Sequence, residues 1–123
     1  MSSRFEFIKH RGKKIFYLNL REAEADEIGG ILNEAKKVIS KEPQNSVRHL
    51  SDVTNHNFSR QTVQELKDYA NHNDAFIYRS AAIGVTGISV VLFNAVVKFS
   101  KRKNLVLKGS LEEALDWLAE VEK

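Results

Sequence analysis

Hydrophobic and polar positions follow two different periods along this chain and predict a succession of strands and helices. The longest apolar segment, residues 80–97, has no charged side chain in eighteen positions, which reaches the lower length limit of a membrane-spanning helix. Gly84 and Gly87 interrupt this segment. Residues 75–83 predict a strand, and residues 88–99 predict a helix that is apolar around most of its circumference. We therefore expect half of a parallel βαβ unit in a soluble α/β domain.

The remaining pattern predicts four more strands and three more helices. Apolar alternation at residues 5–9 and an apolar run at 14–20, joined by a turn at 10–13, predict an N-terminal β-hairpin. Further strands are predicted at residues 46–53 and 104–108, and helices at 22–41, from 60 onward and from 111 onward. The order is ββαβαβαβα. Right-handed crossovers then favour a mixed, mostly parallel sheet of about five strands with four helices and an antiparallel N-terminal edge.

Two adjacent glycines lie inside the first predicted helix. Gly29 and Gly30 each cost about 1 kcal/mol relative to alanine in a helix interior. Either the helix begins near Gly30, or a neighbouring element packs closely against this point. The sequence leaves both explanations open.

Composition indicates one compact domain over residues 1–123. Hydrophobic residues make up 42% and charged residues 28%, which are ordinary values for a globular protein. The chain has no cysteine, which excludes disulfides and zinc–thiolate sites and is compatible with the cytoplasmic location that we expect. A net charge of +3, mostly scattered, does not favour a nucleic-acid partner.

Partners and ligands of open α/β sheets gather at the carboxyl ends of the strands, where we expect the loops at residues 19–21, 52–59 and 84–87. The middle loop is the most polar and supplies Asp52, Thr54, Asn55, His56 and Ser59. A phosphate on Ser59 would meet free backbone N–H groups at a helix start. Simple capping by Ser59 and turn closure by Asp52 explain the same residues, and we favour that explanation.

Two further groups of residues are candidates for binding. The turn with Gly84, Thr86 and Gly87 could hold an anion, although tight turning into a packed helix explains it better. The basic cluster after the apolar helix could contact anionic lipid headgroups, although lysines also suit a helix C-terminus; its residues are Lys98, Phe99, Lys101, Arg102 and Lys103. The histidines lack metal-ligand spacing and no nucleophile–base pair is supported, so we expect no metal, no cofactor and no catalysis.

Several motifs together resemble a known family. The segment VRHLSDVTNHNFS, the run SAAIGVTGISVVLFNAVVKFSKR and the ending LEEALDWLAE resemble the SpoIIAA-like proteins, over nearly the whole chain. These are stand-alone relatives of the STAS domain, whose fold is also compared with CRAL-TRIO lipid-transfer domains. The resemblance implies a mixed five-stranded sheet with four helices, no enzyme activity and a role as a regulatory docking module.

The resemblance also implies a candidate regulatory serine. In anti-sigma-factor antagonists of the STAS group, a serine of an Asp-Ser motif at the start of a helix is phosphorylated and controls partner binding. The corresponding residues 52–59 contain Asp52 but no Asp-Ser pair, and the nearby hydroxyls belong to Thr54 and Ser59.

We therefore expect a non-enzymatic STAS-like module that binds a protein partner or a small anion through residues 52–59 and the 84–87 turn. The alternative is a lipid or apolar-ligand binder with peripheral membrane association, in which residues 85–99 form a movable lid and residues 98–103 contact headgroups. We also expect a homodimer, because a second copy could cover so apolar a helix.

Overall fold

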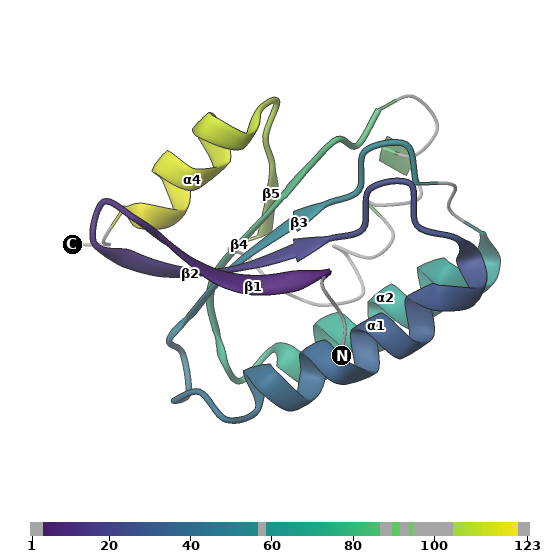
Figure 1. Cartoon of the computed structure of the whole chain (residues 1–123), viewed down its shortest axis with the longest axis horizontal. Coiled ribbons are helices and arrows are strands. Elements are labelled where there is room, and N and C mark those ends of the chain that lie inside the picture. The colour runs from purple at the N-terminus through teal and green to yellow at the C-terminus, as the bar shows by residue number, and fades with distance from the viewer. Residues whose placement is uncertain (1–3, 57–58, 87–89, 92–93, 95–104, 121–123) are drawn as a thin grey trace.

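The computed structural model describes residues 4–56, 59–86, 90–91, 94 and 105–120. Figure 1 shows a five-stranded sheet in the order β1-β2-β3-β4-β5, formed by β1 (Phe5–His10), β2 (Lys13–Asn19), β3 (Val47–Asp52), β4 (Ile77–Ile83) and β5 (Leu105–Leu107). β1 is antiparallel to β2, and the other neighbouring strands are parallel. The described helices are α1 (Ala25–Ile39), α2 (Arg60–Asn73) and α4 (Leu111–Ala119). The predicted α/β class and the mixed, mostly parallel sheet are confirmed.

The uncharged segment begins as predicted. Its first residues belong to β4, and Gly84 follows with a φ of +81°. Val90, Val91 and Asn94 are helical, but most of the predicted helix at 88–99 lies outside the described residues and stays a prediction. Within the part of the chain that the structure describes, no helix has the length and apolarity needed to cross a bilayer.

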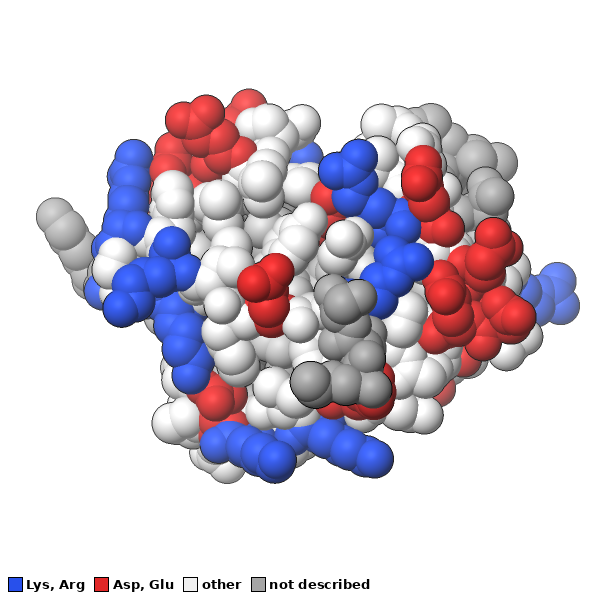
Figure 2. Space-filling view, viewed as in Figure 1, with Lys and Arg blue, Asp and Glu red and all other residues white. Residues whose placement is uncertain are grey.

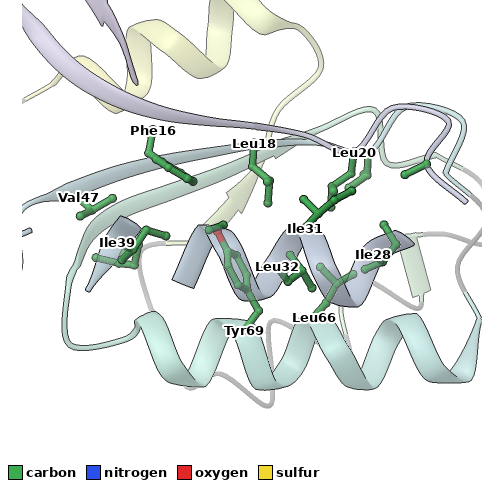
Figure 3. Packing of buried hydrophobic residues seen from close by; sticks show 14 of the residues in the cluster. Phe16, Leu18, Leu20, Ile28, Ile31, Leu32, Ile39, Val47, Leu66 and Tyr69 are labelled. Carbon is green, nitrogen blue, oxygen red and sulfur yellow. The ribbon is translucent and has the colours of Figure 1, made fainter. Parts of the chain in front are cut away.

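The larger core lies between the sheet and the helices α1 and α2, which Figure 1 shows on one face. Strands β2, β3 and β4 are neighbours in chain order, so right-handed crossovers place both connecting helices on the same side. Side chains from the sheet and both helices interdigitate in Figure 3; its labelled residues are Phe16, Leu18, Leu20, Ile28, Ile31, Leu32, Ile39, Val47, Leu66 and Tyr69.

The opposite face of the sheet is covered by α4 over a second core that includes Ile15, Leu50 and Leu118. Two arginines from the central strands hold the C-terminal end of this helix. Arg48 Nη1 donates to the carbonyls of Leu118 at 2.6 Å and Glu120 at 3.0 Å, and Arg79 Nη1 donates to the carbonyl of Trp117 at 2.8 Å. Carbonyls at the end of a helix lack the usual partner one turn further on, so the half-buried Arg48 and the buried Arg79 supply donors to them and complement the helix dipole. The Trp117 carbonyl also accepts the Glu120 N–H at 3.2 Å.

The structure decides between the two explanations for the paired glycines. Helix α1 begins at Ala25, so a helix start near Gly30 is wrong. A Cβ atom on Gly29 would overlap the carboxylate of Glu65 in α2, so a neighbouring element does pack closely there. Gly30 has no atom within 4 Å of its Cβ position, and nothing in the described residues explains it.

Candidate functional site

Three loops meet at the carboxyl edge of the sheet, as expected for strands that run parallel. The backbone N–H of Leu20 donates to the Asp52 carbonyl at 2.8 Å, and that of Glu22 donates to the Thr54 carbonyl at 3.0 Å. On the other side, the N–H of Val53 donates to the Ile83 carbonyl at 3.0 Å. The loop after β3 is therefore fastened between the loops after β2 and β4. We call this junction, residues 20–24, 53–56 with Ser59, and 84–86, the loop edge.

Asp52 organises the centre of the loop edge. Its Oδ1 accepts hydrogen bonds from the backbone N–H of Thr54 at 3.0 Å and from the Thr54 hydroxyl at 2.6 Å. Its Oδ2 accepts one from the Tyr17 hydroxyl at 3.3 Å and lies 3.9 Å from Arg21 Nη1. Asp52 is only 3% exposed, so these contacts replace its hydration. The turn-closing role that the sequence favoured for Asp52 is confirmed.

Tyr17 is a member of this cluster that the sequence reasoning missed. Burial, and next the charge of Asp52 and the hydrogen bond to it, raise the pKa of the Tyr17 phenol above its usual value. A protonated phenol therefore donates to the carboxylate at neutral pH. Strict alternation along β2 places Tyr17 on the face opposite Phe16 and Leu18. The alternation of side chains along β2 could have revealed Tyr17 as part of the site, because the parallel register brings this residue near the end of β3.

Each loop of the edge contains one residue in the left-handed backbone region. These are Glu22 with a φ of 55°, Asn55 with a φ of 57° and Gly84 with a φ of 81°. The conformation costs a residue that carries a Cβ about 1–2 kcal/mol. Gly84 avoids this cost, and it also lies so close to Thr54 that a Cβ there would overlap it. The three loops are thus held in one conformation by their mutual contacts.

His56 is a buried residue of the loop edge and is only 4% exposed. Its Nδ1 lies 3.2 Å from the Ala23 carbonyl, so Nδ1 carries the proton and donates to that oxygen. Burial lowers the pKa of His56, and the Ala23 hydrogen bond raises it by a smaller amount. His56 therefore positions the loop after β3 against the loop after β2, and it does not offer its ring to a partner.

Ser59 is the N-cap of α2. Its Oγ accepts a hydrogen bond from the backbone N–H of Thr62 at 3.1 Å, and its own N–H donates to Thr62 Oγ1 at 2.7 Å. This reciprocal pair is a capping box, so the predicted capping role is confirmed. Ser59 is also exposed, and the first turn of α2 contains no acidic residue. Its phosphorylation stays a prediction.

The remaining candidates divide into described and undescribed residues. Asn55 and Thr86 are exposed at the loop edge, whereas Thr54 and Gly84 are half-buried. The second glycine of the turn and the whole basic cluster lie outside the described residues, so anion binding by the turn and peripheral membrane contact both stay predictions. These residues are Gly87, Lys98, Phe99, Lys101, Arg102 and Lys103. Among described side chains, no group of three or more His, Asp or Glu could hold a metal ion.

Comparisons of the chain with protein-family models, with curated proteins and with solved structures find no match. The resemblance to SpoIIAA-like proteins therefore depends on the sequence motifs.

Proposed function

We propose that the chain is a non-enzymatic, STAS-like binding module of the cytoplasm that docks a protein partner on its loop edge. One observation carries this proposal: three loops are locked together by backbone hydrogen bonds, and two of them hold a residue other than glycine, Glu22 or Asn55, in the left-handed region. Such residues persist where the surrounding structure holds them, and they cluster at binding sites. A preformed edge also loses little conformational entropy when a partner binds.

Charge at the loop edge favours a protein partner over a small anion. Exposed carboxylates gather where α1 begins, and Figure 2 shows them as an acidic area on that side of the molecule; the residues are Glu22, Glu24, Asp26 and Glu27. A small anion would meet these charges together with the buried carboxylate of Asp52. A partner with basic residues around its contact surface would be attracted by the same charges.

Ser59 is the better candidate for a regulatory hydroxyl. The Thr54 hydroxyl donates to Asp52 and lies against Gly84, so a phosphate has no room there. The Ser59 hydroxyl is exposed at the start of α2, where a phosphate could accept from the backbone N–H groups that Ser59 now caps. A doubly negative group at this position would add to the acidic charge of the loop edge and strengthen its attraction for a basic partner surface.

Site-specific photo-cross-linking tests the proposal. A photoreactive side chain is placed at exposed Thr86 in the loop edge or at exposed Arg60 next to it. The matched control is exposed Gln44, in the loop before β3. Because Gln44 lies at the amino ends of the strands, we expect one partner to cross-link from Thr86 and Arg60 but not from Gln44. Equal cross-linking from Gln44 would contradict the proposal.

Substitution of Ser59 tests the regulatory role separately. We expect Ser59→Glu to increase the cross-linked product several-fold, because the added carboxylate attracts the basic partner surface. Ser59→Ala should leave its yield unchanged while lowering the free energy of unfolding by about 1 kcal/mol, because only the cap is lost. Unchanged cross-linking with Ser59→Glu would remove Ser59 from the proposal and leave it as a cap.

A further inference from the structure

The outer side of β1 is an edge of the sheet, and no described strand pairs with it (Figure 1). The inner side pairs with β2, and the Asn19 N–H donates to the Arg4 carbonyl at 2.6 Å. Hydrogen-bonded pairs recur at every second residue in an antiparallel ladder, so Glu6, Ile8 and His10 direct their backbone groups toward β2. The N–H and C=O groups of the alternate residues of β1 consequently point outward.

The hairpin turn gives the same assignment independently. Arg11 and Gly12 have φ values of 52° and 78°, which define a two-residue type I′ turn. The residues that flank such a turn form a hydrogen-bonded pair, here His10 with Lys13. Phe5, Phe7 and Lys9 therefore present three N–H groups and three carbonyls along the outer edge, and none of these groups pairs with a strand that the structure describes.

Side chains fix this edge in place. Phe5 and Phe7 contact the ring of Phe16 with centroid distances of 5.5 Å and 5.2 Å. On the other face, His10 Nε2 lies 2.8 Å from Asp116 Oδ1 in α4. Phe7 nevertheless stays 36% exposed, one of four large apolar side chains that are exposed among the described residues. The edge is an ordered strand with apolar surface still open to solvent.

We propose that β1 pairs with β1 of a second copy of the chain, antiparallel and about a two-fold axis at Ile8. An axis normal to the sheet keeps each face on its own side, so opposite residues must share a face. In this register Phe7 lies opposite Lys9, Glu6 opposite His10, and Ile8 opposite itself. The outward groups of Phe7 and Lys9 form four backbone hydrogen bonds across the axis.

Other registers are less complementary. An axis at Glu6 places two glutamates directly opposite each other, which is destabilising. An axis at Phe7 pairs Phe7 with itself and Phe5 with Lys9. It also places Glu6 opposite the aliphatic Ile8 and Arg4 opposite His10, so that neither charge has an opposite partner. The register centred on Ile8 keeps Lys9 opposite an aromatic ring and in addition gives Glu6 a basic cross-strand neighbour in His10.

The interface is small, so the dimer should dissociate on dilution. A single strand edge buries less than the roughly 1,000 Å² expected of a stable interface. In sedimentation velocity, we expect the average mass to rise from 14.0 kDa toward twice that value as the concentration approaches about 1 mM. Lys9→Pro should stay monomeric and folded, because proline removes an outward N–H that the monomer does not use. A wild-type chain that stays monomeric, or a Lys9→Pro variant that still dimerises, would overturn the proposal.

Disulfide trapping tests the register. The chain contains no cysteine, so a single introduced thiol can bridge only two copies. In the proposed register Ile8→Cys forms a non-hydrogen-bonded pair with Cα atoms about 4.5 Å apart, within the range of a disulfide. Lys9→Cys would face its counterpart diagonally at roughly 7–8 Å, beyond easy reach. We expect Ile8→Cys to oxidise to a dimer at least tenfold faster, and equal rates would overturn the register.

Discussion

Replacing Gly84 by alanine should lower the free energy of unfolding more than the same change at any other described glycine. The φ of +81° costs an alanine about 1–2 kcal/mol. The new Cβ would also lie 2.6 Å from Thr54 N and 2.7 Å from Thr54 Cα. Backbone atoms cannot rotate away, so this overlap adds about 1–3 kcal/mol. We expect Gly84→Ala to lower the free energy of unfolding by about 3 kcal/mol in all.

Gly30→Ala is the matched control. Gly30 is in the interior of α1, has no atom within 4 Å of its Cβ position and has no positive φ. Alanine there should raise the free energy of unfolding by about 1 kcal/mol, because it restricts the unfolded chain and suits the helix. The same substitution is therefore expected to lower the free energy of unfolding at Gly84 and to raise it at Gly30.

Urea unfolding followed by circular dichroism measures both effects as shifts of the midpoint at constant slope. A Gly84→Ala variant within about 1 kcal/mol of the wild type would refute the reasoning, because neither the backbone region nor the Thr54 contact would then matter. A destabilised Gly30→Ala would show that α1 meets another element at this glycine.

Two further predictions concern buried polar groups. Because the pKa of His56 is lowered in the folded state, the unfolded state takes up its proton first, so stability should fall as the pH drops through 6.5. His56→Gln should lessen this loss of stability, which urea unfolding at pH 7.5 and 5.5 would measure. A variant with the same pH dependence as the wild type would contradict the prediction. Arg79→Met removes the donor to the Trp117 carbonyl and should cost about 1–3 kcal/mol while shifting the fluorescence of the single tryptophan. Unchanged stability and emission would show that Arg48 suffices to hold α4.

Local patterns predicted the elements because the signals lie within a few residues of each other. The alternation in β2 and the cap at Ser59 are of this kind, and both are present. The first helix was predicted to begin at residue 22, but it begins at Ala25, because Glu22 adopts a positive φ and its N–H bonds to Thr54. That contact spans two loops, and no local spacing reveals it.

The contacts that escaped prediction join residues far apart in the chain. Arg48 reaches the Leu118 carbonyl across 70 positions, and the Tyr17 hydroxyl reaches Asp52 across 35. Both depend on strand register and on where a helix ends, which hydrophobic periodicity does not determine. The position of the candidate site at the carboxyl edge was predictable because parallel strands share that edge. Its internal hydrogen bonds were not.

The order of the strands affects what the loop edge can accept. From β2 to β4 the chain moves in one direction across the sheet, with α1 and α2 behind it on a single face. Deep crevices in open sheets arise where successive connections depart to opposite faces, and β2, β3 and β4 contain no such reversal. A partner that docks at the loop edge would therefore contact a continuous surface without a deep crevice. Its selection would depend on the shape of its contact surface, and its affinity would be distributed over many shallow contacts.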